Sequence, residues 1–332
     1  MKIDFVITWV DGSDSEWRKE KSKYDPTFNP DAGDDRYRDM GFLKYWFRAV
    51  EKYAPWVNKV HFITWGHLPE WLNTEYEKLN IVKHEDYMPN EYLPTFSSRP
   101  LELNMCKIKN LCEHFVYFND DMILNAPVKE EFFFQKGLPC DFAYSKNISA
   151  NFVGEMYSVI QMNESCVVNK YYSYIKTFFK HPLKFVNIKY SLSANIKNIL
   201  KLENFNVITG FEDLHLACPY IKSDMLKLWE KEAELFDSVS KNKFRTYSDV
   251  CQRVFRYMRL AGGRFYPVSK VSRGKIFRVE NENKRLIQAI KDENIKMLCI
   301  NDTPESINFD KVKEELIKVF EEKLPEKSNF EK

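Results

Sequence analysis

The chain has 332 residues, of which 44% are hydrophobic, and its 50 Lys and Arg residues nearly balance 48 Asp and Glu residues. A chain of this length can bury a large core, as one large domain or two modest ones. The near-neutral charge argues against bulk nucleic-acid binding, which needs a strongly basic domain. Seven cysteines, an odd number without a CxxC pair, argue against a disulfide framework or a zinc site.

The first apolar run, residues 2–10, is typical of a strand and lacks the cleavage site of a signal peptide. No stretch approaches the roughly 18 consecutive apolar residues that a membrane-spanning helix needs. We therefore expect a soluble, cytoplasmic protein whose cysteines stay reduced.

The elements of the first half follow in an order typical of α/β proteins. In chain order the sequence predicts a strand at 2–10, a helix at 40–53, strands at 60–65 and 81–84, a helix at 99–113 and a strand at 115–118. This β-α-β-β-α-β order predicts an α/β fold in which helices cover a mostly parallel sheet.

The amino-acid composition of the chain changes after residue 145. Residues 166–202 contain seven lysines and no Asp or Glu, with aromatic and aliphatic residues between them. We expect a basic, mostly helical insertion over 150–210, within a single domain of 1–332. The later elements are predicted as helices at 222–236 and 247–261, short strands within 263–279, a strand at 296–300 and a charged helix with a frayed end at 308–332.

Three apolar strands end in acidic or amide side chains, at Asp11, at Asn119-Asp120-Asp121 and at Asn301-Asp302. An Asp after a strand is most often a turn or capping residue. If the strands are neighbours in one sheet, however, the three groups converge at its carboxyl edge and repel one another unless a cation binds. Oxygen ligands favour Mg²⁺ or Mn²⁺, which would bridge the oxygens of a diphosphate.

Five arginines lie near these motifs: Arg36, Arg38, Arg48, Arg99 and Arg245. The guanidinium fork suits phosphate oxygens. A surface or ion-pairing role is the alternative for each of them.

These motifs, in this order, resemble the four conserved regions of the Stealth family. The first region is similar to residues 3–14, with Thr8-Trp9-Val10-Asp11-Gly12 at its centre. The second runs from Arg36 through 51–57, 68–72 and 93–98 to Glu102 and 117–121; the third includes His215, Pro219, Lys222, Phe244-Arg245 and Asp249; and the fourth is Cys299-Ile300-Asn301-Asp302. The match spans most of the chain, with 166–202 as the exception.

The chain departs from the family pattern in two places. Phe42 and Trp46 stand where many members have Glu and Ser, which would reshape a sugar or acceptor pocket. Three residues, rather than fewer, separate His215 from Pro219.

The resemblance implies a sugar-1-phosphate transferase with a sheet of the glycosyltransferase-A or Rossmann-like type. In this reaction an acceptor hydroxyl attacks the β-phosphorus of a nucleotide-sugar, commonly a UDP-sugar, and UMP leaves as a phosphodiester forms. The expected partners are therefore a nucleotide-sugar donor and a polysaccharide or lipid-linked saccharide acceptor, in surface polysaccharide synthesis. The alternatives are a metal-dependent glycosyltransferase that releases UDP and a protein that binds the sugar nucleotide or polysaccharide without turnover.

With the resemblance, roles are assigned to individual residues. The expected Mg²⁺ or Mn²⁺ ligands are Asp120, Asp121, Asn301 and Asp302. The expected catalytic residues are His215 as general base, with Asp11 or Asp14 as its competitors, and Arg38 and Arg245 as stabilisers of phosphoryl charge. The expected substrate-binding residues are Asp4, Trp9, Gly12, Arg36, Ser98, Glu102 and Asn119.

The basic segment 166–202 has three interpretations. It could meet anionic lipid or a lipid-linked acceptor, which would place the protein at the inner face of the membrane. It could also form a groove for a polyanionic product, or be a solvated helical face.

Overall fold

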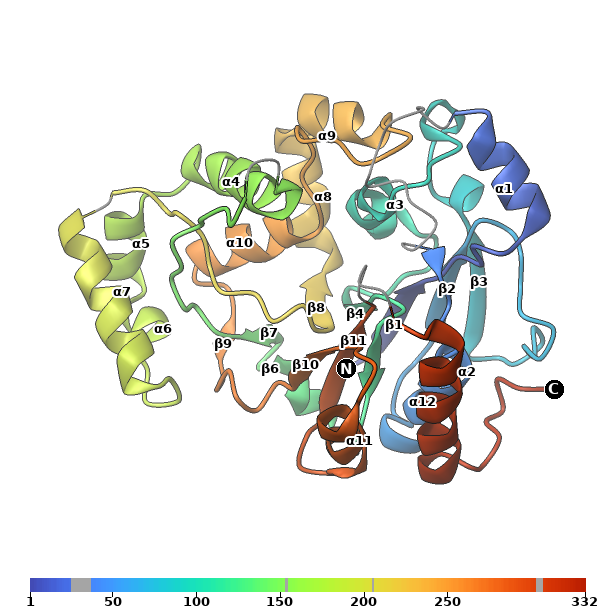
Figure 1. Ribbon diagram of the computed structural model, residues 1–332. Helices are drawn as coiled ribbons and strands as arrows, with labels where there is room; N and C mark the ends of the chain where they lie inside the picture. The colour runs from blue at the N-terminus through green and yellow to red at the C-terminus, as the bar shows by residue number, and fades with distance from the viewer. Residues whose placement is uncertain (25–36, 153–154, 205, 303–306) are drawn as a thin grey trace.

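The computed structural model describes residues 1–24, 37–152, 155–204, 206–302 and 307–332. Its central sheet has five strands in the order β3-β2-β1-β4-β8 (Figure 1). These are β1 (Ile3–Thr8), β2 (Val60–Thr64), β3 (Leu79–Lys83), β4 (His114–Phe118) and β8 (Cys218–Ile221). All neighbours pair in parallel except β4 and β8. The expectation of an α/β fold with a mostly parallel sheet is confirmed, and the order 3-2-1-4 is that of a Rossmann-like half.

Helices cover both faces of this sheet, so its strands are apolar on both sides. Phe5 and Ile7 of β1 face one core, while Val6 between them faces the other. The first core includes α2 (Leu43–Tyr53), α11 (Lys284–Lys291) and α12 (Phe309–Lys323). The second includes α3 (Ser98–Asn104), α8 (Lys222–Lys231), α9 (Ala233–Ser240) and α10 (Arg253–Ala261).

Helix α3 is shorter than the helix predicted over 99–113. The side chain of Asn104 donates to the carbonyl of Pro100 at 2.8 Å, and a 3₁₀ turn follows at Met105–Lys107. An Asn side chain that bonds back to the preceding turn weakens a helix, which accounts for the early end. The helix predicted at 222–236 is divided in the structure into α8 and α9.

Two small sheets complete the strands. One has the order β10-β11-β5, with β5 (Met122–Leu124), β10 (Lys275–Arg278) and β11 (Met297–Asn301), and the other has the order β6-β7-β9, with β6 (Phe134–Gln135), β7 (Leu138–Asp141) and β9 (Tyr266–Pro267). The condition that all three strands are neighbours in one sheet is therefore not met, because β11 lies outside the central sheet. Instead, β5 begins directly after Asp121 and pairs antiparallel with β11, and the amide of Ile300 donates to the carbonyl of Asp121 at 2.8 Å.

The helices α4 (Met156–Asn169), α5 (Tyr174–Lys180), α6 (Pro182–Phe185) and α7 (Leu192–Asn204) lie within the range expected to be a helical insertion. Figure 1 shows α5, α6 and α7 at the far side of the molecule from β3 and α1 (Ser15–Ser22). They share a core with α10 that includes Phe178, Phe185 and Tyr257. None of the helices in the described ranges has the length and apolar character that crossing a bilayer requires.

The last residues do not fray after α12, so that expectation is wrong. Leu324 and Phe330 are buried in the first core. The carboxylate of Glu331 forms an ion pair with the guanidinium of Arg48 in α2, with Nε and Oε1 2.9 Å apart. Apolar contacts and this ion pair therefore fix residues 324–332 against α2.

Candidate active site

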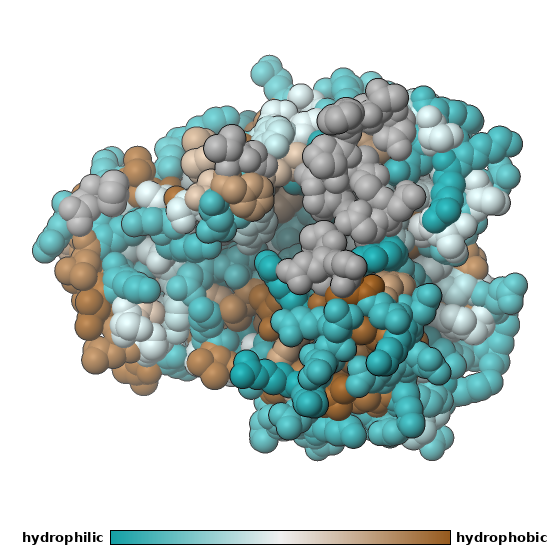
Figure 2. Space-filling model, viewed as in Figure 1, coloured by the Kyte–Doolittle hydropathy of each residue, from teal (hydrophilic) through white to brown (hydrophobic). Residues whose placement is uncertain are grey.

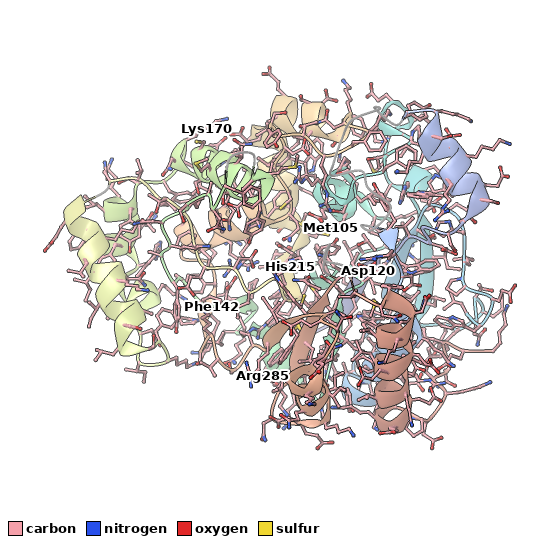
Figure 3. The ribbon with its side chains drawn as sticks, viewed as in Figure 1. Met105, Asp120, Phe142, Lys170, His215 and Arg285 are labelled. Atoms are coloured by element: carbon pink, nitrogen blue, oxygen red, sulfur yellow. The ribbon has the colours of Figure 1, made fainter. Side chains whose placement is uncertain are left out.

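A cavity of about 670 Å³ lies at the carboxyl end of the central sheet. Residues that follow β1, β3 and β4 line it, together with the end of β11 and the start of α3. This is the edge at which open α/β sheets bind ligands. Of the residues expected to act, the cavity wall includes Trp9, Arg38, Ser98, Asn119, Asp120, Asp121, His215, Arg245, Asn301 and Asp302. Figure 3 shows Asp120 and His215 near each other at the centre of the molecule.

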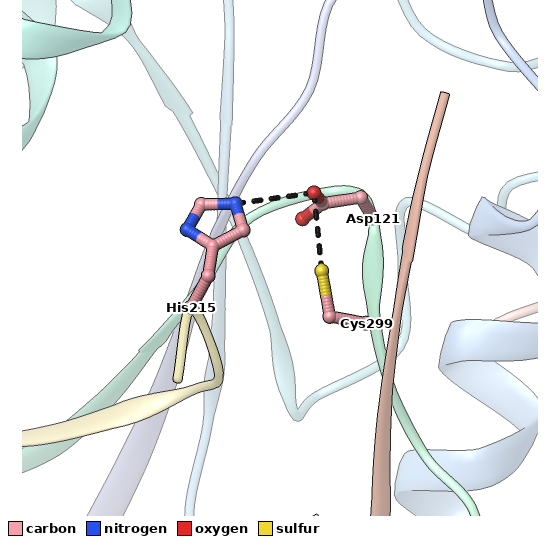
Figure 4. A group of neighbouring side chains, drawn as sticks. All are labelled: Asp121, His215 and Cys299. Carbon is pink, nitrogen blue, oxygen red and sulfur yellow. Dashed lines mark hydrogen bonds and ion pairs between the residues drawn. The ribbon is translucent and has the colours of Figure 1, made fainter. Parts of the chain in front are cut away.

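Asp121 is the link between three parts of the chain. Its Oδ2 lies 3.2 Å from Nε2 of His215 and 3.4 Å from Sγ of Cys299 (Figure 4). The amide nitrogen Nδ2 of Asn119 lies 3.5 Å from the same Nε2. Three segments therefore meet at the carboxylate of Asp121: the motif that ends β4, the loop that precedes β8, and strand β11.

The backbone of His215 is held in an uncommon conformation, with a φ of 42°. Its amide donates to Oδ1 of Asp213 at 3.2 Å, and Asp213 pairs with Arg253 at 3.1 Å. A non-glycine residue in the left-handed region persists only where the surroundings impose it, and such residues are concentrated at functional sites. The loop thus presents the His215 imidazole to the cavity.

The charges of the site shift two pKa values. Asp120 is exposed to the cavity but surrounded by protein, and removal from bulk water, with repulsion from Asp121 and Asp39, raises its pKa to about 7. Burial disfavours charge on His215, but the hydrogen bond and charge of Asp121, together with Asp213, raise its pKa above the ordinary value. Crowded carboxylates of this kind favour a bound cation or proton.

The site offers oxygen atoms that lack partners. Among the described residues, Oδ1 of Asp121 and Oδ1 of Asn119 are buried acceptors without a hydrogen-bond donor. Such atoms are costly to bury, and a hard cation would satisfy them. Asp120, Asn301 and Asp302 add further oxygens to the same wall.

A thiol also lies within reach of this cluster. The ligand atoms of Asp121, His215 and Cys299 are within 4.8 Å of one another. Burial and the charge of Asp121 raise the pKa of Cys299 well above its usual range, so the thiol stays protonated and donates to Asp121. Because thiols bind metals as thiolates, the donor set fits Mg²⁺ or Mn²⁺ better than a thiophilic metal.

The two expected arginines of the cavity differ in their partners. Arg38 is paired with Asp302, with Nε and Oδ2 2.9 Å apart, and lies over the ring of Phe309. Arg245 has no ion-pair or hydrogen-bond partner within the described part of the chain, and burial and the charge of Arg99 lower its pKa. A half-buried guanidinium without a counter-ion is ready to bind an anion.

Other arginines of the sequence motifs are committed to structural pairs. Arg48 pairs with Glu331, and Arg99 pairs with Asp249 at 2.6 Å. Arg36 lies outside the described residues.

Several expected site residues do not line the cavity as the structure describes it. Asp4 is fully buried within β1, where it bonds to Nε2 of His61 at 3.0 Å and accepts from Asn58 and the amide of Cys112. Glu102 is buried in α3 and accepts from the amide of Gln252 at 3.3 Å. Neither side chain lines the cavity, because both carboxylates are enclosed by protein donors.

Residues 11–14, farther along the loop after β1, do not line the cavity. Asp11 accepts from the amide of Ser13 at 2.8 Å, and Asp14 caps α1 by accepting from the amide of Trp17 at 2.7 Å. A Cβ on Gly12 would lie 2.2 Å from the carbonyl oxygen of Tyr37, so this glycine is explained by chain packing rather than by an approaching nucleotide. Asp11 and Asp14 are therefore poorly placed to compete with His215 as the base.

The family departures have different consequences. Phe42 lines the cavity, as expected of a residue that reshapes a pocket. Trp46 is instead buried in the core, where its ring packs edge-on against Phe118 at 5.4 Å.

The sequence reasoning missed His84 and an aromatic wall formed by Trp17, Tyr37 and Phe96. His84 could have been found from its position directly after β3, because Asp120 was predicted from the same kind of position after β4. The aromatic wall had no such signal, because its members come from α1, the segment before α2 and the segment before α3.

His84 is expected to make stability depend on pH. Burial, with repulsion from His67, lowers the pKa of His84 to about 4, from an ordinary value of about 6.5. Between pH 6.5 and 4 the unfolded chain therefore binds a proton that the native chain does not, and stability falls as the pH falls. The expected contribution is about 3 kcal/mol, measured as the pH dependence of urea unfolding in His84→Gln against wild type. His114→Gln, at a half-buried histidine of β4, serves as control. Parallel curves for wild type and His84→Gln would contradict the prediction.

Comparisons with known proteins agree with this geometry. The family model described as Stealth protein CR2, conserved region 2, matches residues 36–140, and that of Stealth protein CR1, conserved region 1, matches residues 1–28. The capsular polysaccharide phosphotransferase WcwK of Streptococcus pneumoniae is 42% identical, over 100% of this chain and 98% of its own. The receptor polysaccharide phosphotransferase WefC of Streptococcus oralis is 38% identical, over 99% of both chains.

Among solved structures, the galactosyltransferase LgtC with donor and acceptor sugar analogs covers 98% of both chains at 10% identity and a TM-score of 0.39. A likeness at that level carries no weight for the mechanism. The full-length identity to polysaccharide phosphotransferases, with both matching conserved regions, shows that the chain belongs to the Stealth family.

Proposed function

We propose that this protein transfers a sugar-1-phosphate from a nucleotide-sugar, a UDP-sugar, to an acceptor hydroxyl during synthesis of a surface polysaccharide. The acceptor oxygen forms a bond to the β-phosphorus, and the bond between that phosphorus and the bridging oxygen of UMP breaks. The hydroxyl proton passes to a base, and the product is a phosphodiester. One observation carries the proposal: a single cavity combines a carboxylate cluster, a His–Asp pair and an arginine that has no counter-ion among the described residues.

His215 is proposed as the general base. With its Nε2 proton directed at Asp121, its Nδ1 carries the lone pair that takes the proton of the acceptor hydroxyl. Asp121 fixes the orientation of the ring and stabilises the imidazolium that forms, as the carboxylate of a catalytic triad does.

Arg245 is proposed to bind the phosphoryl oxygens of the donor, since it lines the cavity and pairs with no side chain of the ranges that the structure describes. Arg38 would contribute from the same cavity wall, where its ion pair with Asp302 orients the guanidinium. Such donors stabilise the charge that develops on the transferring and leaving phosphates. Phe42 and the wall of Trp17, Tyr37 and Phe96 supply flat apolar surface for the base or the sugar.

A divalent cation, Mg²⁺ or Mn²⁺, is proposed for the oxygens of Asp120, Asp121, Asn301 and Asp302, with Asn119 beside them. When bound, such a cation would offset the negative charge of the donor diphosphate. The unpartnered Oδ1 atoms of Asp121 and Asn119 support this assignment.

Product analysis tests the function. The protein is incubated with Mg²⁺, UDP-sugars and a polysaccharide or lipid-linked acceptor, and the released nucleotide and the phosphorus NMR spectrum are recorded. We expect UMP and a new phosphodiester from wild type and from the matched control Asp237→Asn on the surface of α9, with at least about a hundredfold less from Asp121→Asn. UDP with a glycosidic product would instead establish the glycosyltransferase alternative, and donor binding without turnover would establish a binding protein.

A further inference from the structure

Helix α7 is built with its apolar side facing outward. Leu192, Ile196, Ile199 and Leu200 are all exposed, and their spacing places them on one face of the helix. Leu192 is 76% exposed, which leaves most of its side chain in water. In a helix of a globular protein this face would normally be turned to the core.

The inner face of α7 is small and polar instead. Ala194, Asn198 and Lys201 are buried. Asn198 is fully enclosed: its Oδ1 accepts from the amide of Ser145 at 2.9 Å, and its Nδ2 donates to the carbonyls of Ala143 and Phe185 at 2.8 and 2.7 Å. These bonds fix the rotation of α7, so the outward apolar face is specified by the fold.

The apolar surface continues beyond α7. Leu183 of α6 is 77% exposed, Ile188 is 100% exposed and Phe179 of α5 is 69% exposed. Figure 2 shows hydrophobic surface gathered along the outer edge of the molecule where α5, α6 and α7 lie in Figure 1. A patch of exposed apolar side chains on neighbouring helices marks an interaction surface. We call these side chains, with the four of α7, the outer patch.

Positive charge surrounds the outer patch. Residues 166–202 contain seven lysines and no acidic residue, and Lys176, Lys180, Lys189 and Lys197 among them are exposed. Lys170, Lys184 and Lys201 are held by protein partners. Glu203, at the end of α7, is the acidic residue that closes the apolar stripe.

We propose that the outer patch binds the surface of an anionic lipid bilayer, with the aliphatic side chains inserted among the acyl chains and the lysines at the headgroups. Charge complementarity favours this partner, because two copies of the chain would bring lysines of the same sign together. Aliphatic side chains offer a polysaccharide no hydrogen bonds, whereas insertion into lipid removes their area from water. The proposal does not depend on the transferase reaction, since it concerns a surface outside the cavity.

Vesicle sedimentation of the full chain tests the proposal. Vesicles of phosphatidylglycerol and phosphatidylcholine are compared with vesicles of phosphatidylcholine alone. The apolar variant carries Leu192→Ser, Ile196→Ser and Leu200→Ser, and its control is Leu226→Ser on α8. The charge variant carries Lys176→Gln, Lys180→Gln and Lys197→Gln, and its control carries Lys109→Gln, Lys227→Gln and Lys311→Gln.

Wild type and both controls should bind the anionic vesicles, and each patch variant should bind them about tenfold or more weakly. Because the replaced side chains are exposed, circular dichroism and the thermal midpoint should stay unchanged. Absence of wild-type binding, or equal binding by the apolar variant, would overturn the proposal. A wild-type dimer that Leu192→Ser, Ile196→Ser and Leu200→Ser convert to monomer, without vesicle binding, would identify the patch as an interface between copies and would equally overturn it.

Discussion

Replacing His215 by asparagine should lower kcat by about a thousandfold, while the affinity for the donor changes little. The His215 imidazole is the proposed base: it lines the cavity and is held by Asp121 at 3.2 Å. Asparagine is chosen because the position has a φ of 42°, and asparagine tolerates the left-handed region better than most residues. The backbone loop should therefore survive the change, so that lost activity reports the lost base.

Steady-state kinetics and donor titration by calorimetry separate the two roles of this residue. A general base affects kcat, whereas a residue that merely supports the loop would also weaken donor binding and lower the thermal midpoint. The control is His114→Asn. His114 begins β4, at the end of the strand away from Asp120, and it does not line the cavity, so the variant should retain wild-type kinetics. If His215→Asn keeps more than about a tenth of wild-type kcat, another cavity group is the base.

Local patterns predicted the parts of the fold that depend on neighbouring residues. The apolar runs of β1, β2 and β4 and the helical spacing of α2 are read directly from the sequence, and the structure confirms them within a few residues. Parallel strands buried on both faces are apolar throughout, which makes them conspicuous. For the same reason, the sequence alone places the carboxylates that end β4 at the sheet edge.

The direction of a polar side chain could not be predicted in this way. Asp14 and Asp121 both follow an apolar strand, yet one caps a helix and the other enters the cavity. Asp4 lies on the same face of β1 as Val6, and its carboxylate is bound in a buried hydrogen-bond network with His61. Which donors surround a carboxylate is decided by segments distant in sequence, and motif position alone does not contain that information.

The same limit explains β11. Its residues Asn301 and Asp302 do reach the cavity, as expected, but they arrive through pairing with β5 rather than beside β1. The approach of two strands from opposite ends of the chain is a long-range event without a local signal. The polar side chains of Asn301 and Asp302 therefore predicted their position in the cavity correctly, although β11 is not part of the central sheet.

The ion pair between Arg48 and Glu331, which holds the last residues against α2, should contribute strongly to stability. Glu331→Ala should lower the free energy of unfolding by about 3–5 kcal/mol. The guanidinium of Arg48 is buried, and it holds both oxygens of Glu331, at 2.9 and 3.0 Å. Its remaining bonds go to the carbonyls of Leu324 and Pro325, at 2.7 and 3.4 Å, and to Glu321 at 3.1 Å. They cannot replace the lost carboxylate, so a buried charge would be left poorly compensated.

Urea unfolding at neutral pH measures this effect, with Glu322→Ala as the matched control on the surface of α12. Glu322 forms an exposed contact with Lys291 at 3.6 Å, and its loss should cost about 0.5 kcal/mol or less. The double variant Arg48→Met with Glu331→Leu should recover much of the lost stability, because it removes both charges together. A Glu331→Ala protein within about 1 kcal/mol of wild type would show that the ion pair does not anchor residues 324–332.

The same anchor reaches the cavity through the two helices that it joins. Phe42, directly before α2, lines the cavity, and Phe309, at the start of α12, lies under the guanidinium of Arg38. Loosening the contact between α2 and the last residues should therefore loosen the support of Arg38 and Phe42 as well. We expect Glu331→Ala to raise KM for the donor more than it lowers kcat, since binding surfaces move while His215 and Asp121 stay on the central sheet and its adjoining loop.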